Sequence, residues 1–532
     1  MEKTVFIALL LFLSPILLSY SCQMLKATNT TGYEILIITP EEFYDEALRL
    51  KEFKDRTGRP TAIASLERSV YPSFSYGDGP EKIKRYIALV ESIYHIKYVI
   101  LIGDADKLPV RFRVTDRTES SKLPTDGEVV DAIGAYYASD IYYADLYKED
   151  GSFEDWDYNR NGYYAEFHAE YYTNDPINVD RIDMVPDIAV GRIPASTVGE
   201  LRTYIDKVIR YESGQIFTSG TLTLIPMLKE ALIIAPIFGT ESEGYEYLWG
   251  STRVGDYVAD TLESYGFTCT KLYDDPSTST SLTSPRAIER GLERVPYMFA
   301  IHLGHANRNV LDLGRGGLWY HSNFINLRTE NKLPIFFSVG CGSAGFVTEP
   351  PYQDYIDESG VLRRGMHHWG LYIPPRPSPI QSGSVEKDSL AEAALVKTGG
   401  GTIVYIGAIT GAQSPSMELL KHFFEGYHDG VAVGDMWKYM ITQYVENYKI
   451  HDRNIGRGEH EIHSSDWFDG AQYDQPLKFL LFGDPSLVVG GLSNHPPILA
   501  PLVGEWVIVN ESTRYTLNPS SLVRYIDDES ST

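Results

Sequence analysis

The sequence predicts an α/β protein with mostly parallel, doubly wound sheets. Two observations predict this fold class. Short continuous apolar runs recur along the chain, as expected for strands that are buried on both faces of a parallel sheet. Stretches with helical spacing separate these runs, which is typical of β-α-β units. The rhythm appears early in the chain and restarts in its second half, so we expect two stacked α/β units.

The first unit begins with the apolar run Tyr33–Thr39, which predicts a buried strand. Pro40 and the two acidic residues after it are typical of a helix start, and the helix is expected to end near Thr57. The elements expected next are a strand at Thr61–Ser65, a helix at Gly79–Tyr94 and a strand at Tyr98–Ile102.

The second unit repeats this alternation. We expect strands at Ala231–Pro236, Lys271–Tyr273, Tyr297–Leu303, Lys332–Gly340 and Gly401–Ile406. We expect helices near Val254–Tyr265, Pro285–Arg294, Ser416–Tyr427 and Gly434–Tyr448. Residues 347–388 are rich in Pro, Gly and Ser and lack apolar periodicity, so they predict a long insertion loop of the kind that forms lids.

The first residues read as a targeting segment. A lysine precedes an apolar run from Val5 to Leu18, and small residues flank Tyr20, which is the pattern of a secretory signal peptide over residues 1–22. The apolar run is short for a membrane span, which needs about 20 residues. We therefore expect a secreted or cell-surface protein. The alternative is membrane attachment through a retained anchor or through a lipid on Cys22.

The remaining chain divides into three parts. We assign residues 23–217 to the N-terminal α/β subdomain and residues 218–491 to the second one. Residues 492–532 form a short appendage. Its proline-rich start and its alternation of Val, Ile and Tyr resemble the first strands of an Ig-like sandwich, but it is far shorter than the about 100 residues of that fold.

Charge and cysteine content exclude several classes of protein. The 532-residue chain has a formal net charge of −25, and such an acidic surface repels phosphate backbones, so we expect no nucleic-acid partner. Three cysteines are too few for a disulfide scaffold or a cysteine-rich zinc module.

Two predicted strands of the second unit end in residues that can carry out chemistry. One is followed by Gly304 and His305, the next by a glycine-flanked Cys341. The carboxyl ends of neighbouring parallel strands lie together, where sites form in open α/β sheets. An imidazole there can take the thiol proton, and backbone N–H groups can bind an oxyanion. The alternative is that Cys341 is a small buried hydrophobic residue.

An acidic loop in the first unit predicts a cation site. Oxygen-bearing side chains alternate before Gly162, which permits a sharp turn, and a carboxylate follows. The alternative is a solvated turn rich in Asx residues. The proposed calcium ligands are Asp155, Asp157, Asn159, Asn161 and Glu166.

Several of these motifs occur together in one known family. The order of Gly191-Arg192, Gly304-His305, Cys341 and Phe482–Pro485, with the segments Ile102–Pro109 and Pro186–Pro194, resembles the gingipain-type cysteine peptidases, peptidase family C25 of the caspase-like clan. The resemblance covers most of residues 33–491. It implies a caspase-like fold and a cysteine endopeptidase that acts on a protein or peptide substrate.

The resemblance also implies roles for individual residues. Cys341 matches the nucleophile and His305 the general base, whereas His302 falls outside the family's Gly-His position and is expected to be structural. Calcium in relatives is structural, and no organic cofactor is implied. Backbone groups at Gly304, Ala306 and Gly342 would form the oxyanion site, and the candidates for an acid that orients the base are Glu241 and Glu243.

Two other functions share these residues. A sortase-like transpeptidase of the same family would use an amine in place of water as the acceptor. A calcium-binding surface protein would keep the fold without catalysis. The stretch Trp249–Arg253 and Pro415 do not match the specificity pocket of arginine-specific gingipains, so no preference for a basic residue is implied.

Overall fold

The computed structural model describes most of the chain between residues 32 and 492 and two later strands. The described residues are 32–115, 135–166, 178, 180–218, 221–224, 228–236, 251–274, 283–329, 332–365, 374–382, 388–413, 415–447, 474–492, 506–510 and 513–517. The predicted signal peptide therefore lies outside the described residues.

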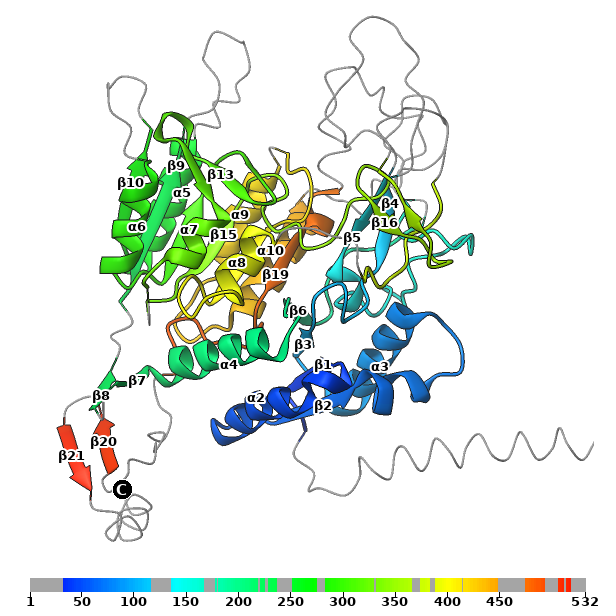
Figure 1. Cartoon of the computed structure of the whole chain (residues 1–532), viewed down its shortest axis with the longest axis horizontal. Helices are drawn as coiled ribbons and strands as arrows, with labels where there is room; N and C mark the ends of the chain where they lie inside the picture. Colours follow the sequence, from blue (N-terminus) through cyan, green and yellow to red (C-terminus); the bar gives the residue numbers. More distant parts are fainter. Residues whose placement is uncertain are drawn as a thin grey trace, which may run out of the picture.

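A ten-stranded sheet runs through the molecule (Figure 1), in the order β10-β9-β11-β15-β18-β19-β6-β3-β1-β2. The strands from the first part of the chain are β1 (Ile35–Thr39), β2 (Thr61–Ser65), β3 (Tyr98–Ile102) and β6 (Ala189–Ile193). The strands from the second part are β9 (Glu230–Ala235), β10 (Thr268–Tyr273), β11 (Phe299–His302), β15 (Ile335–Ser338), β18 (Val404–Ala408) and β19 (Phe479–Phe482). This α/β sheet confirms the predicted fold class.

Within each half of the sheet the strands are parallel, and one strand reverses the direction. β19 pairs antiparallel with β18 and parallel with β6. The two α/β units consequently share one continuous sheet, with their strands running in opposite directions. The carboxyl ends of β11, β15 and β18 therefore lie at one edge, and those of β1, β3 and β6 lie at the opposite edge.

The described helices cover the sheet, and those that the sequence predicts lie close to their expected positions. α3 (Gly79–Tyr94) and α6 (Pro285–Arg294) have the expected bounds, and Asp78 and Ser284 cap their first turns. The other helices are α2 (Tyr44–Arg56), α4 (Val198–Ser213), α5 (Ser251–Ser264), α7 (His321–Asn326), α8 (Leu390–Leu395), α9 (Ser416–Glu425) and α10 (Val433–Asn447). Short helical turns lie at Glu41–Phe43, Leu66–Val70, Tyr71–Ser73, Asp140–Tyr143, Gly314–Gly316 and Pro476–Lys478.

In addition to the main sheet, the described residues form several two- and three-stranded sheets. Their strands are β4 (Phe112–Thr115) with β5 (Ala135–Ala138), β12 (Ala306–Asn307) with β13 (Val310–Asp312) and β14 (Leu318–Tyr320), β16 (Tyr355–Ile356) with β17 (Leu362–Arg363), β7 (Gln215–Thr218) with β8 (Thr221–Leu224), and β20 (Trp506–Asn510) with β21 (Thr513–Leu517). The predicted appendage thus contains a β-hairpin, which is consistent with its alternating pattern.

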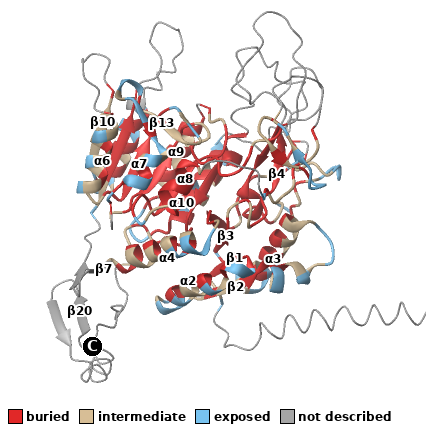
Figure 2. Cartoon of the chain, viewed as in Figure 1, coloured by how far each residue is buried: buried red, intermediate tan, exposed pale blue. Residues whose placement is uncertain are grey.

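The sheet is the core of the protein. Every residue of β1, β3, β11, β15, β18 and β19 is buried, which explains why these strands are mostly continuous apolar runs rather than alternating patterns (Figure 2). No described helix has both the length and the apolar character needed to cross a bilayer.

The joint between the two halves depends on a close backbone approach. A Cβ on Gly191 in β6 would lie 2.5 Å from the carbonyl oxygen of Gly483, which follows β19. Next to Gly191, the buried Arg192 pairs with Asp140 at 2.6 Å and donates to the carbonyl oxygen of Gly103 at 2.8 Å. The Gly191-Arg192 and Gly483-Asp484 motifs therefore serve the fold.

Candidate functional site

The two predicted catalytic loops leave neighbouring strands at the same edge of the sheet. β11 and β15 are parallel neighbours, and their last residues, His302 and Ser338, stand opposite each other in register. His305 and Cys341 each follow three residues later. The sheet topology therefore brings together two loops that are far apart in sequence, as the strand-end interpretation requires.

Glycine allows these loops to touch. A Cβ on Gly340 would overlap the Cβ of Ala306 and would lie 2.8 Å from the carbonyl oxygen of Gly304. The backbone that precedes Cys341 is therefore packed directly against the residues that flank His305. A larger residue at position 340 would push the two loops apart.

Cys341 lies half-buried at the start of a tight turn, and the loop after β18 holds its sulfur. The thiol donates to the carbonyl oxygen of Ala412 at 3.2 Å, and the N–H of Ala412 donates to Sγ at 3.3 Å. Gly342 has φ of 59°, a left-handed conformation that glycine adopts without strain. Cys341 is thus held from two sides, by its own turn and by residues 410–412.

The side chain of His305 is exposed at the start of the small β12–β14 sheet, and its carbonyl oxygen accepts the N–H of Asp312 at 2.8 Å. The neighbouring His302 is fully buried. Its Nδ1 lies 3.1 Å from Ser338 Oγ, and its Nε2 lies 3.1 Å from the carbonyl oxygen of Asp312. Burial lowers the pKa of His302 to about 4, so its ring is neutral near pH 7. This environment fits the expected structural role.

The oxyanion prediction needs one correction. The N–H of Gly342 donates to the carbonyl oxygen of Thr410 at 2.7 Å, so it fixes the turn and does not face a substrate. This bond ties the turn after Cys341 to the loop that follows β18. The backbone groups at Gly304 and Ala306 stay predictions for this role. Glu241 and Glu243, the candidate orienting acids, lie outside the described residues.

Sequence reasoning missed a buried polar cluster behind Cys341. The ammonium of Lys478, just before β19, donates to the carbonyl oxygen of Gly411 and to Oε1 of Gln413, both at 2.9 Å. It also pairs with Asp474 at 3.0 Å, and Asp474 in turn pairs with the buried Arg113 of β4. A lysine beside the apolar run of β19 is a weak sequence signal, because its partners come from distant segments.

The predicted calcium loop is compact. Oδ1 and Oδ2 of Asp157 accept the N–H groups of Asn161 at 2.9 Å and of Gly162 at 3.1 Å. The amide groups of Asn159 and Asn161 both donate to Oε2 of Glu166, at 2.7 and 2.8 Å. Four of the five predicted ligands therefore lie together.

The fifth predicted ligand and the arrangement of the acids weaken the calcium prediction. An oxygen of Asp155 lies 4.0 Å from Lys148, outside the hydrogen bonds of the loop. Within the part of the chain that the structure describes, no three His, Cys, Asp or Glu side chains form a group suited to a metal ion. The hydrogen bonds are those of an Asx-rich turn, the alternative interpretation, and calcium stays a prediction.

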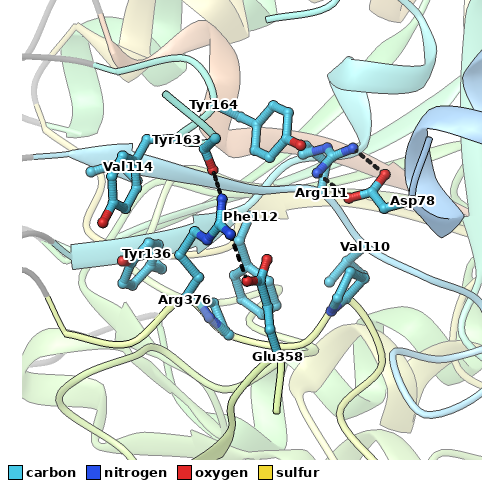
Figure 3. A pocket seen from close by; sticks show the side chains of 13 residues that line it. Asp78, Val110, Arg111, Phe112, Val114, Tyr136, Tyr163, Tyr164, Glu358 and Arg376 are labelled. Atoms are coloured by element: carbon cyan, nitrogen blue, oxygen red, sulfur yellow. Dashed lines mark hydrogen bonds and ion pairs between the residues drawn. The ribbon is translucent and has the colours of Figure 1, made fainter. Parts of the chain in front are cut away.

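The segment expected to form a lid packs against this loop in its described parts (Figure 3). Arg376 donates to the carbonyl oxygen of Gly162 at 2.7 Å and pairs with Glu358 at 2.9 Å. The pocket between them, near Arg111 and Tyr164, has a volume of about 20 Å³, room for roughly one water molecule. Residues 366–373, which include the His367-His368 pair, lie outside the described residues.

Comparisons with known proteins agree with this architecture. An uncharacterized protein of Archaeoglobus fulgidus is 25% identical over 347 residues, which are 60% of this chain and 68% of that protein. The complex of the pro- and mature domains of RgpB from Porphyromonas gingivalis matches with a TM-score of 0.52 and 19% identity, over 86% of this chain and 79% of that one. The arginine-specific cysteine proteinase gingipain R matches with a TM-score of 0.52 and 16% identity, over 92% of both chains.

These structural likenesses establish the shared fold. The profile of peptidase family C25 matches residues 28–490, which is most of the chain. The chain therefore belongs to peptidase family C25, a family of cysteine peptidases, and has the α/β fold of the gingipains.

Proposed function

We propose that the protein is a secreted cysteine endopeptidase in which Cys341 is the nucleophile and His305 the general base. The observation that carries this proposal is the contact between the two loops, where Gly340 packs against Gly304 and Ala306. It brings a thiol and an imidazole to one edge of the sheet in a chain that belongs to a cysteine peptidase family.

The reaction follows from the chemistry of these groups. His305 accepts the proton of the Cys341 thiol, and the thiolate attacks the carbonyl carbon of a peptide bond. The leaving amine takes the proton from the imidazolium, which leaves an acyl group on sulfur. Water, deprotonated by His305, then hydrolyses the thioester and restores the thiol.

The tetrahedral intermediates carry a negative oxygen that needs hydrogen-bond donors. Backbone N–H groups of Cys341 and of the Gly304–Ala306 segment are the proposed donors. This assignment is supported by the packing of Gly340, which directly precedes Cys341, against that segment.

Peptide-library profiling by mass spectrometry tests the catalytic proposal. The wild-type protein is expected to cleave, and Cys341→Ala and His305→Ala are expected to be inactive, whereas Cys269→Ala keeps wild-type activity. Cys269 is a suitable control because it lies on β10 and its thiol donates to Ala259 rather than to the catalytic loops. Cleavage by Cys341→Ala would contradict the proposal, and ligated products would indicate a transpeptidase instead.

Secretion is proposed from the signal-peptide pattern of residues 1–22. N-terminal sequencing of the protein recovered from the culture medium of an expressing cell is expected to begin just after this segment. Retention of the intact N-terminus in the cell pellet would contradict secretion, and a lipid-modified Cys22 in the membrane fraction would indicate an anchored protein.

Structural calcium is also proposed. It is supported by the clustering of Asp157, Glu166 and two asparagines in one loop, since oxygen ligands suit this cation. Calcium is expected to raise the melting temperature of the wild-type protein but not that of an Asp157→Asn/Glu166→Gln variant. Equal melting temperatures with calcium and with a chelator would favour a plain turn.

A further inference from the structure

The buried cluster behind Cys341 is built around one lysine that has polar partners on several segments. Lys478 is fully buried, and its ammonium has three hydrogens to donate. It donates to the carbonyl of Gly411 and to the side chain of Gln413, both at 2.9 Å, and it forms an ion pair with Asp474 at 3.0 Å. Burying a charge is costly unless it is paired and hydrogen-bonded, so the position is specified by several segments at once.

Two of these three contacts hold the loop that touches the catalytic sulfur. Gly411 and Gln413 flank Ala412, whose backbone N–H and carbonyl oxygen both contact Cys341 Sγ. Gln475, from the same segment as Lys478, accepts the N–H of Gln413 at 3.2 Å. The loop that carries Ala412 is therefore clamped on both sides by residues 474–478.

The same lysine also acts on Cys341 through its charge. Burial is the largest influence on the pKa of Lys478 and lowers it, while Asp474 and, less strongly, a negative charge on Cys341 act in the opposite direction. An interaction energy between two charges belongs to both of them. A cation held against the loop that contacts the sulfur therefore attracts a negative charge there.

Other charged groups face the cluster. Asp474 comes from the same segment as Lys478, and Arg113 of β4 lies on the far side of Asp474. The ring centre of Tyr137 lies 5.8 Å from the Arg113 guanidinium carbon, and Glu349 acts electrostatically on Tyr137. Lys478 is the cation of this cluster that contacts the loop carrying Ala412.

We propose that Lys478 is a positioning residue of the peptidase, which holds the Ala412 loop against Cys341 and favours the thiolate form of its sulfur. This inference rests on the proposed role of Cys341. Lys478 does not contact substrate, and it acts on the reaction through the loop and through its charge.

The test measures the alkylation of Cys341 directly, apart from peptidase activity. The rate of iodoacetamide labelling is followed against pH by mass spectrometry of the peptide that contains Cys341, because only the thiolate reacts. Cys269 is an internal reference, since burial raises its pKa to about 11 and its labelling at neutral pH stays slow in every variant.

Two variants remove the charge in different ways. Lys478→Met removes both charge and hydrogen bonds, whereas Lys478→Gln keeps an N–H donor for the carbonyl of Gly411. Both are expected to move the pH midpoint of Cys341 labelling upward by about one unit, which lowers the rate at pH 7 roughly tenfold. Their kcat/KM is expected to fall at pH 7 and to recover partly at higher pH.

Two controls separate this effect from a general loss of structure. Gln475→Leu disturbs the same loop without removing a charge and is expected to leave the labelling midpoint unchanged. Lys207→Met removes another fully buried lysine, one whose ammonium donates to the carbonyl oxygens of Ala394 and Leu395 instead. It is expected to lower stability and to leave the midpoint unchanged.

The outcomes separate the two proposals. If Lys478→Gln folds and its labelling midpoint equals that of the wild type, the role of Lys478 is wrong even when Cys341 is the nucleophile. If Lys207→Met shifts the midpoint as much as the Lys478 variants, the effect is structural and the role is again wrong. The proposed function is tested separately. Cleavage of peptides by Cys341→Ala would show that Cys341 is not the nucleophile, whatever the role of Lys478.

Discussion

At the scale of single residues, the contact between the two proposed catalytic loops depends on the absence of a side chain at Gly340. Alanine there would place its Cβ against the Cβ of Ala306 and the backbone of Gly304, and backbone cannot move aside as a flexible side chain can. We expect Gly340→Ala to lower kcat/KM at least about tenfold, because small displacements of reacting groups are costly.

The control for this change is Gly399→Ala. No atom lies within 4 Å of a Cβ at position 399, so this variant adds the same methyl group in open space. It is expected to match the wild type in kcat/KM and in melting temperature. Equal activity of Gly340→Ala and Gly399→Ala would show that the loop contact is not needed for catalysis.

His302 predicts a pH dependence of stability. Its pKa is about 4 in the folded protein against 6.5 as the ordinary value, mainly because it is buried, with a smaller contribution of the same sign from His305. Between these two values the unfolded chain binds more protons than the folded one. Stability therefore rises with pH in this window, is complete above pH 6.5, and is lost as pH falls through 4.

A variant that cannot titrate isolates this contribution. For His302→Asn we expect the wild-type loss of unfolding free energy between pH 6.5 and 4 to shrink by about 3 kcal/mol. Urea denaturation of both proteins across this range measures the difference, and the absolute stability of the variant does not enter it. Parallel pH profiles of the two proteins would contradict a neutral, buried His302.

At the scale of elements, the sequence predicts individual strands better than the pairing of β6 with β19, which joins the two halves of the sheet. β2 and β3 have the expected bounds because apolar runs between turn residues define them locally. β6 and β19 were quoted only as family motifs, since Gly191 and Arg192 interrupt the first and the second has four residues. Their pairing depends on contacts between residues nearly 300 positions apart, to which no local pattern is sensitive.

The candidate site shows the same difference between local features, which the sequence predicts, and contacts between distant segments, which it does not. Glycines around Cys341 and a Gly-His pair are visible in the sequence, and the topology does bring these loops together. The bond from Gly342 to Thr410 and the cluster at Lys478 were not predictable, because both involve the loop after β18. Periodicity places that loop at a strand end, but it does not say which way its carbonyl groups point.

Arg192 fixes β6 to its surroundings and predicts a large effect for a conservative change. Its guanidinium makes two bonds to Asp140, at 2.6 and 2.8 Å, and also donates to the carbonyl oxygens of Gly103, Leu108 and Pro109. Lysine keeps the charge but cannot reproduce this fork. We expect Arg192→Lys to lower the free energy of unfolding by about 2–4 kcal/mol, measured by chemical denaturation.

The matched control is Arg202→Lys on α4. Arg202 is 59% exposed and pairs with Glu46 at 3.1 Å, so the same substitution is expected to cost about 0.5 kcal/mol or less. Equal losses of unfolding free energy at positions 192 and 202 would mean that the paired hydrogen bonds from Arg192 to Asp140 add little to the stability of the contact between the two halves of the sheet.

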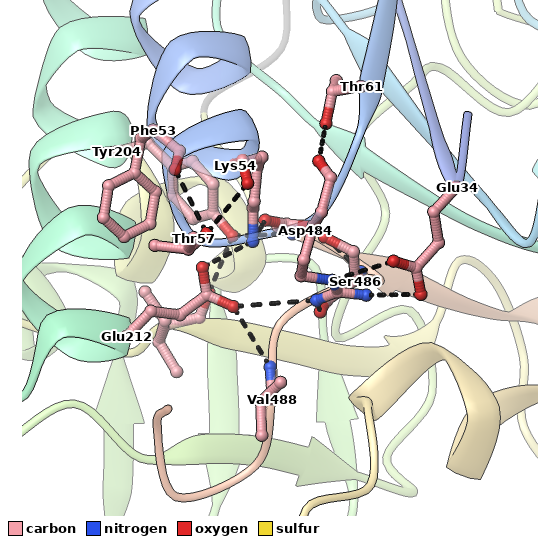
Figure 4. A network of polar contacts seen from close by, with 12 residues as sticks. Glu34, Phe53, Lys54, Thr57, Thr61, Tyr204, Glu212, Asp484, Ser486 and Val488 are labelled. Carbon is pink, nitrogen blue, oxygen red and sulfur yellow. Dashed lines mark hydrogen bonds and ion pairs between the residues drawn. The ribbon is translucent and has the colours of Figure 1, made fainter. Parts of the chain in front are cut away.

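At the scale of the whole molecule, a buried ion cluster ties the end of the family region to its beginning (Figure 4). Lys54 of α2 lies 2.6 Å from Glu212 of α4 and 2.7 Å from Asp484, and all three side chains are fully buried. Asp484 also accepts two hydrogen bonds from Ser486, and Arg59 donates to the carbonyl of Ser486. Burial raises the pKa of Asp484, but Lys54, Ser486 and Arg59 together lower it further, so the net shift is downward.

This cluster predicts a large loss of unfolding free energy when Lys54 is replaced. Lys54→Met would leave the carboxylates of Glu212 and Asp484 buried with Arg59 as the remaining nearby cation, and Arg59 lies 3.9 Å from Glu212. Removal of one partner from a buried ion pair typically costs about 3–5 kcal/mol, so we expect a loss of that size. Lys51→Met, on the same helix but in a partly exposed pair with Asp55, should cost about 0.5 kcal/mol or less.

Denaturation of both variants at pH 7 and pH 4 provides the decisive comparison. Without Lys54, burial is left to raise the pKa of Asp484, so acid protonates this carboxyl more readily and the deficit of Lys54→Met relative to wild type should shrink at pH 4. A deficit that is the same at both pH values would attribute the loss to packing of the lysine stem and not to its charge.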